Sequence, residues 1–92
     1  MISDKQVEKI SKALSDGNRI KILEAIRQNK GALPCCALYD LLNIAQPSIS
    51  HHIKTLTDAD VVLAEKDGRN LSLTVNGPLL DAYIEKIARL KS

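Results

Sequence analysis

The sequence has 92 residues, the size of one domain, and its 45% hydrophobic residues include no Trp, no Phe and two Tyr, so its core must be aliphatic. A net charge of +2, from 13 basic and 11 acidic residues, is only weakly basic, so nucleic-acid binding would need charge gathered on one face or doubled by dimerisation. No apolar run approaches the roughly 18 to 20 residues that span a bilayer, and the starting segment MISDKQVEKI lacks the apolar part of a signal peptide. A cytoplasmic protein of one domain, residues 1–92, with no membrane partner, is therefore expected.

Two amphipathic helices are predicted in the first third of the chain. Ser3 followed three residues later by Gln6 has the pattern of a capping box, which predicts a helix over residues 3–14. The polar segment 15–18 breaks the apolar periodicity. The periodicity then resumes in a second helix, which ends near Gly31 in the manner of a C-cap.

A helix-turn-helix is predicted next. Pro34 suits the first turn of a short helix over residues 34–42, because proline is tolerated there. Only residues 43–45 separate this helix from the next one, which Pro47 permits to start. The apolar stripe of the second helix is Ile49, Ile53 and Leu56.

The last third of the chain predicts a β-hairpin and a terminal helix. Residues 61–75 form two strand-like runs joined at Asp67-Gly68, a tight-turn dipeptide. A helix restarts at Gly77-Pro78, and its apolar arc is unusually broad for a terminal segment. The predicted fold is mainly α with a small β-hairpin: a winged helix-turn-helix with additional terminal helices.

The outward face of the helix after Pro47 predicts DNA contacts. With a rotation of about 100° per residue, His51 lies about 200° from Ile49 and points away from the core. Hydroxyl, amide, imidazole and amine groups can approach phosphates and hydrogen-bond to base edges. The candidate DNA-binding residues are Gln46, Ser48, Ser50, His51, Lys54 and Thr55, with Lys66 and Arg69 on the hairpin. For this helix alone, a solvated face without a partner is the alternative.

His52 has a different position from its neighbour. It lies about 60° from Ile49, on the flank of the buried stripe, which predicts a structural histidine bonded to a neighbouring group. Because His51 and His52 point about 100° apart, they have poor geometry for one metal ion, and a zinc site on this pair is not expected.

These motifs together resemble a known family. "ALSDGNRIKILEAI" and "ALYDLLNIAQPSISHHIKTLTDADVVLAEKDGRNLSL" are similar to the ArsR/SmtB family of small winged-helix transcriptional repressors, and the likeness covers almost the whole chain. The resemblance implies a homodimer, held by the first and last helices, that binds an inverted-repeat operator and is released by an inducer. The broad apolar arc of the terminal helix agrees with such a homodimer. The candidate interface residues are Val7, Ile10, Leu80, Tyr83, Ile84 and Ile87.

One position departs from the family pattern. Ala45 stands where the family often has a serine as N-cap of the recognition helix. Loss of a side-chain cap typically costs about 1 kcal/mol, so operator affinity or fraying of this helix is expected to differ.

The adjacent cysteines leave the question of sensing open. Arsenic-responsive members of the family carry a Cys-x-Cys motif, which falls here on Pro34 and Cys36, so that only Cys36 matches and Cys35 occupies the usually inward position between them. Both cysteines are expected in the first turn of a helix, where the dipole favours thiolate. Three hypotheses remain: sensing of arsenic(III), antimony(III) or another soft metal; thiol oxidation; and no cysteine sensing. Trivalent arsenic favours three sulfur ligands, and one chain offers two.

Two other function classes are alternatives to a repressor. An enzyme is not expected, because the sequence has no glycine-rich phosphate loop and no paired catalytic carboxylates, and His51 is turned away from the cysteines. A winged helix used for protein–protein contacts is the other alternative. Lys66 and Arg69 beside the hairpin turn favour a phosphate backbone over a protein surface, although Asp67 weakens this patch.

Overall fold

A computed structural model describes residues 2–91 of the chain. The elements in order are α1 (Asp4–Ala13), α2 (Gly17–Gln28), β1 (Ala32–Pro34), α3 (Ala37–Leu41), α4 (Gln46–Asp58), β2 (Val62–Asp67), β3 (Asn70–Val75) and α5 (Gly77–Arg89). The predicted winged helix-turn-helix is confirmed. None of the described helices is long and apolar enough to cross a membrane.

Local hydrogen bonds start the first two helices where the sequence predicts. The capping box of α1 is complete, since the Gln6 backbone N–H donates to Ser3 Oγ at 3.1 Å and the Ser3 N–H donates to Gln6 Oε1 at 2.8 Å. Asp16 caps α2 by accepting from the Asn18 N–H at 2.8 Å. Of the two caps, the one at Asp16 lies in the turn between the two helices.

The prediction of a helix over residues 34–42 is wrong at its start. Pro34 is the last residue of β1, a strand that the sequence analysis did not predict, and it pairs with Ser72 of β3. The missing N–H of proline is tolerated because β1 is an edge strand with a single neighbour. The pairing continues one residue further, where the Cys35 N–H donates to the Leu71 carbonyl at 2.8 Å, so α3 cannot begin until Ala37.

The hairpin turn lies one residue later than predicted. Asp67 pairs with Asn70, which leaves Gly68 and Arg69 as the two turn residues. Gly68 has a φ of 66°, and Arg69 does not have a positive φ, which is the pattern of a type II′ turn with glycine first. β3 is the central strand of the antiparallel sheet, in the order β1-β3-β2.

The core is aliphatic, as the composition predicts, and it joins the sheet to α1 through α4. Its largest fully buried side chains are Ile10, Ile22, Ile26, Leu38, Ile49, Leu56, Leu73, Val61 and Val62. The expectation that Ile10 meets a second copy is therefore wrong, because this side chain has no exposed surface within its own chain. Val7, one turn earlier on α1, is half-buried.

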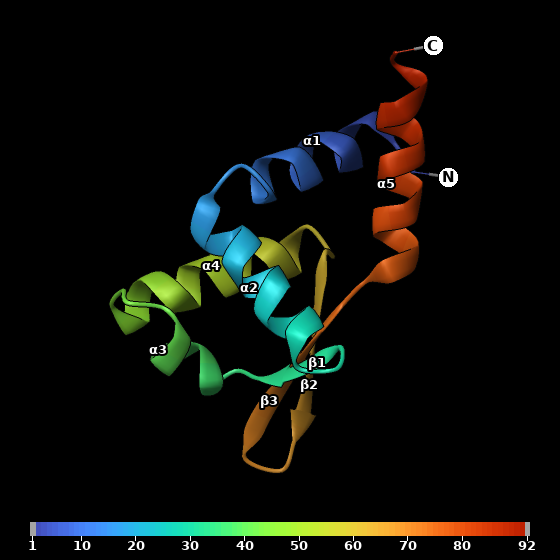
Figure 1. Ribbon diagram of the computed structural model, residues 1–92. Helices are drawn as coiled ribbons and strands as arrows, with labels where there is room; N and C mark the ends of the chain where they lie inside the picture. The colour runs from blue at the N-terminus through green and yellow to red at the C-terminus, as the bar shows by residue number, and fades with distance from the viewer. Residues whose placement is uncertain (1, 92) are drawn as a thin grey trace.

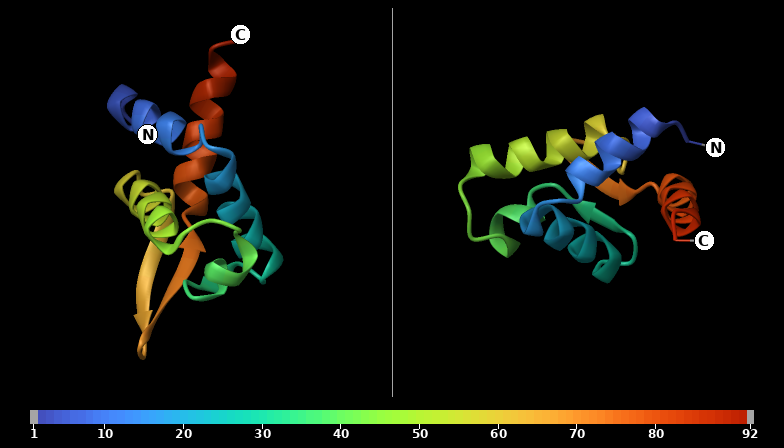
Figure 2. Two further views of the ribbon diagram at one scale, coloured as in Figure 1. Left: turned by 90° about the vertical axis from the view of Figure 1, so that its left-hand side faces the viewer. Right: turned by 90° about the horizontal axis from the view of Figure 1, so that it is seen from above.

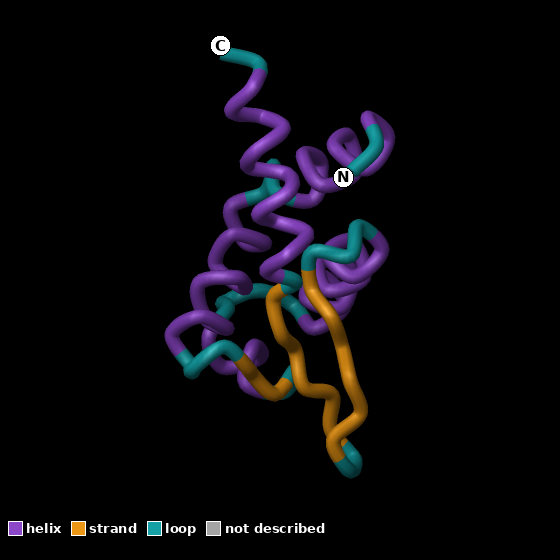
Figure 3. Tube along the Cα trace, turned by 90° about the vertical axis from the view of Figure 1, so that its right-hand side faces the viewer, coloured by secondary structure: helices purple, strands orange, loops and turns teal. Residues whose placement is uncertain are grey.

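The terminal helices and the hairpin occupy opposite ends of an elongated molecule of 43 × 24 × 21 Å (Figure 1). α5 runs along one edge with α1 beside it, and the hairpin projects at the other end (Figures 1 and 3). Two contacts join α1 to α5: Ser11 Oγ lies 2.9 Å from the Tyr83 hydroxyl, and Lys86 Nζ lies 2.9 Å from Asp4 Oδ1. No residue of α5 is buried, which leaves much of its apolar face uncovered.

Candidate nucleic-acid interface

The two sides of α4 have opposite environments. Ile49, His52 and Leu56 are buried against the rest of the domain. The opposite side contains the exposed members of the candidate set, Gln46, Ser48, Ser50, His51 and Lys54. The left view of Figure 2 places α4 and the hairpin tip on the side of the molecule away from α2. The fold therefore presents one polar helix face and one hairpin tip to the same side.

The first turn of α4 is capped by backbone alone. Ala45 is the N-cap and makes no side-chain bond, while its carbonyl accepts from the N–H groups of Ser48 at 3.0 Å and Ile49 at 3.1 Å. Pro47 has no N–H to satisfy. Ala45 is thus the N-cap of α4, as the sequence predicts, and this end of the helix lacks one stabilising side-chain hydrogen bond.

Two of the candidate residues on α4 already have partners within the helix. Lys54 Nζ lies 3.0 Å from Asp58 Oδ2, and the side chains are 73% and 60% exposed. An exposed pair of this kind is worth only about 0.3 to 0.5 kcal/mol, so Lys54 can exchange it for a phosphate at little cost. The half-buried Thr55 donates its hydroxyl proton to the His51 carbonyl at 3.0 Å. Thr55 keeps only acceptor capacity toward the outside.

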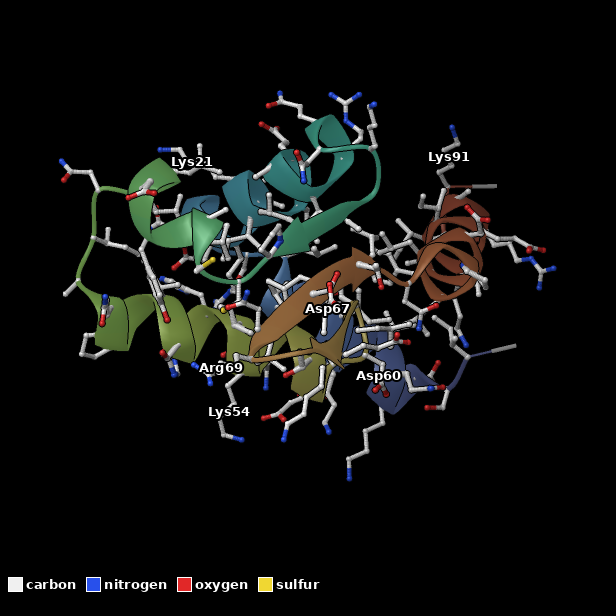
Figure 4. All side chains as sticks on the ribbon, turned by 90° about the horizontal axis from the view of Figure 1, so that it is seen from below. Lys21, Lys54, Asp60, Asp67, Arg69 and Lys91 are labelled. Carbon is white, nitrogen blue, oxygen red and sulfur yellow. The ribbon has the colours of Figure 1, made fainter. Side chains whose placement is uncertain are left out.

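The hairpin contributes two cations without partners. Lys66 and Arg69 are exposed, and within residues 2–91 neither forms an ion pair. Figure 4 shows Arg69 and Lys54 on the same side of the molecule, whereas Lys21 of α2 lies on the opposite side. Asp67, also exposed beside the turn, reduces the positive charge of this tip.

The two histidines of α4 separate as the helical geometry predicts. His51 is exposed, and His52 is 8% exposed. Their ring centroids are 6.0 Å apart with planes inclined by 52°. His52 Nδ1 lies 3.5 Å from Nη1 of Arg19, which is the neighbouring group that the sequence did not specify. Arg19 was visible in the sequence only as part of the opening of the second helix.

The cysteines occupy a turn, not the first turn of a helix. Cys35 and Cys36 connect β1 to α3, and Cys36 is the N-cap position of a helix of only five residues. Burial raises the pKa of the Cys35 thiol, and the neighbouring Cys36 raises it further. The predicted dipole-favoured thiolate is therefore wrong for Cys35. Cys35 is half-buried against the core and Cys36 is exposed, which agrees with their predicted orientations.

The donor set for a metal or metalloid is incomplete within one chain. Two adjacent thiols are present, and residues 2–91 contain no group of three or more histidine, cysteine, aspartate or glutamate side chains placed to hold a metal ion. A three-coordinate metal or metalloid ion bound by the two thiols would need its third donor atom from water or from another molecule.

The uncapped first turn of α4 predicts a gain in stability from Ala45→Ser. A serine hydroxyl at this extended N-cap can accept from a backbone N–H of the first turn, which should raise the free energy of unfolding by about 1 kcal/mol. Urea unfolding of both proteins measures the difference, with Ala64→Ser, an exposed strand position, as the control. Equal stability of Ala45→Ser and wild type would show that solvent already satisfies this turn.

Comparisons with known proteins agree with this geometry. Residues 14–63 match the model of a helix-turn-helix domain family. An arsenical resistance operon repressor of Staphylococcus aureus is 35% identical over 86 residues, covering 94% of this chain and 81% of that protein.

Solved structures show the same fold. An ArsR-like transcriptional regulator from Rhodococcus sp. RHA1 superimposes with a TM-score of 0.82 at 22% identity, over 95% of this chain and 80% of that one. A homodimeric winged helix-turn-helix DNA-binding domain from Mycobacterium bovis gives 0.73 at 21% identity, over 97% and 89%. With the helix-turn-helix, the hairpin and the outward polar face of α4 in place, the chain belongs to the ArsR family of winged-helix DNA-binding transcriptional repressors.

Proposed function

We propose that the protein reads its operator with the outer face of α4 in the major groove, while the β2–β3 hairpin follows the phosphate backbone. The observation that carries this proposal is the exposed polar face around His51, which the burial of Ile49, His52 and Leu56 turns outward. Imidazole, hydroxyl and amide groups can distinguish base edges in the major groove. Lys54 and Arg69, on the same side, would supply the contacts to phosphates.

The proposed functional unit is a homodimer formed through α5. Ile84 is 61% exposed and Ile87 38%, on a helix that has no buried residue, and its C-cap residue Leu90 is 79% exposed. These side chains line an open apolar groove of about 510 Å3 together with Tyr83, Ala88 and Lys91. The homodimeric Mycobacterium bovis domain supports such an assembly. A twofold dimer presents two copies of α4, so the operator would be an inverted repeat.

The inducer proposed for this repressor is arsenic(III), antimony(III) or another soft metal, with a thiol oxidant as the alternative signal. The name of the Staphylococcus aureus relative and the adjacent thiols support the metalloid. Exposed Cys36 would be contacted first, because Cys35 is half-buried and its pKa is raised by burial. A ligand here would act on α3 and on β3, since the Cys35 N–H is bonded to the Leu71 carbonyl.

One observation favours a second function, a protein-binding hairpin. Leu63 and Leu71 are 42% and 39% exposed on β2 and β3, and exposed apolar residues on a wing suit a protein partner. Replacing Leu63 and Leu71 with Thr distinguishes a protein-binding hairpin from a DNA-binding one. A DNA-binding wing would keep its operator affinity within about threefold, because the phosphate contacts are left intact.

His51→Ala is expected to weaken specific operator binding by about 1 to 3 kcal/mol, because a base-edge contact is lost. Fluorescence anisotropy with operator and scrambled duplexes, at matched salt, measures both affinities. Lys54→Ala is the matched control on the same helix. It should weaken binding to both duplexes alike and reduce the slope of log affinity against log salt concentration by about one. Wild-type operator affinity for His51→Ala would rule out this reading face.

Replacing Ile84 and Ile87 with Asp is expected to dissociate the dimer, because two charges per chain would be buried in an apolar interface at a cost of several kcal/mol. Sedimentation equilibrium gives the association state, and Asp81→Ala, at an exposed polar position of α5, serves as control. A wild-type protein that is monomeric at tens of micromolar would contradict the proposed assembly.

Cys36→Ser is expected to bind the operator normally and to lose the inducer response, with Cys35→Ser losing it in part. The response itself should be about 5- to 150-fold weaker operator binding, the range of a typical coupling free energy. Anisotropy titrations with arsenite, antimonite and hydrogen peroxide, each alone, identify the signal. If the double serine variant responded like wild type, the cysteines would be structural.

A further inference from the structure

Among residues 2–91, His52 is the one polar or charged side chain that is buried. It belongs to the recognition helix and follows His51 directly, so its position fixes the rotation of the face proposed to read DNA. A buried imidazole needs a partner for its ring nitrogens, because an unpaired buried polar group costs free energy. Its described partner is Arg19 of α2, whose Nη1 lies 3.5 Å from Nδ1 of His52.

Arg19 also connects to the end of α1. Its Nη2 donates to the Lys12 carbonyl at 3.4 Å, so a single guanidinium bridges α1, α2 and α4. Its Nε is the one buried side-chain nitrogen or oxygen of the described residues that has no hydrogen-bond partner. Arg19 therefore lies between three helices with one of its N–H donors unpaired.

The charged groups nearest His52 both belong to α2. Arg19 faces the ring directly, and Asp16, the N-cap of α2, is the nearby anion. The hydrogen bond from the Asn18 backbone N–H lowers the pKa of Asp16. No hydrogen bond joins Asp16 to His52 within the described residues, and the neighbour on α4 itself is the ring of His51. The Lys12 side chain is paired with Glu8 on the surface.

The chemistry of the guanidinium sets the direction of this hydrogen bond. A guanidinium has only donors, so Nδ1 of His52 is the acceptor.

We propose that Arg19 is a positioning residue for operator recognition: by donating to Nδ1 of His52 it holds the reading face of α4 in place. The proposal rests on the proposed reading of DNA by α4. Loss of the contact should therefore lower affinity for the operator more than affinity for an unrelated duplex, which depends on phosphate contacts.

The test measures specific and non-specific duplex affinity, at one pH and salt concentration, for wild type, His52→Asn, His52→Leu and Arg19→Met. The amide oxygen of Asn can take the place of Nδ1 as acceptor, whereas Leu has no acceptor. His52→Leu and Arg19→Met should each lose about threefold to tenfold in the ratio of specific to non-specific affinity, the equivalent of one hydrogen bond. His52→Asn should keep the wild-type ratio.

Lys21→Met, the same substitution at an exposed position of α2 on the side away from Lys54, is the matched control and should behave like wild type. Circular dichroism confirms that the proteins compared are folded. A role in stability alone would lower the melting temperature and leave the affinity ratio unchanged, which would overturn the proposal. Equal affinity ratios of wild type and His52→Leu would also overturn it, even if Arg19→Met failed to fold. Absence of specific binding by wild type would instead contradict the proposed function.

Discussion

The burial of one side of α4 is the constraint on which the rest of the structure depends. Ile49 and Leu56 are completely buried, so the helix cannot rotate without exposing them to water, at about 1.5 to 3 kcal/mol for each side chain. The polar side is thereby held outward, although its own first turn has no side-chain cap. A chain without Phe or Trp achieves this with aliphatic residues drawn from most elements of the domain.

Two connections join the proposed DNA-facing side to the rest of the domain. Arg19 ties α4 to α1 and α2. The backbone bond from Cys35 to Leu71 ties the cysteine turn to β3, the central strand of the sheet. If the cysteine turn moved when the proposed inducer bound, the movement would reach the hairpin as well as α3.

The sequence predicts the features whose signals are local and misses those that depend on pairing. Capping residues and 3.6-residue periodicity predict α1, α2, α4 and α5, and helical geometry separates buried His52 from exposed His51. β1 is missed because three residues carry no periodicity, and Pro34 favours a helix start until its partner strand is known. The contact between Arg19 and His52 is missed for the same reason, since the two residues lie 33 positions apart in the sequence.

The central claim is that the outer face of α4, with the tip of the hairpin, is the surface that meets DNA. The most direct measurement is a titration of isotope-labelled protein with a duplex selected from a random library, followed by backbone amide chemical shifts. The largest changes are predicted over residues 46–54 and at Gly68 and Arg69, with little change at the exposed positions of α2. Changes concentrated on α2 or on the Leu63 and Leu71 surface, with residues 46–54 unaffected, would contradict the account.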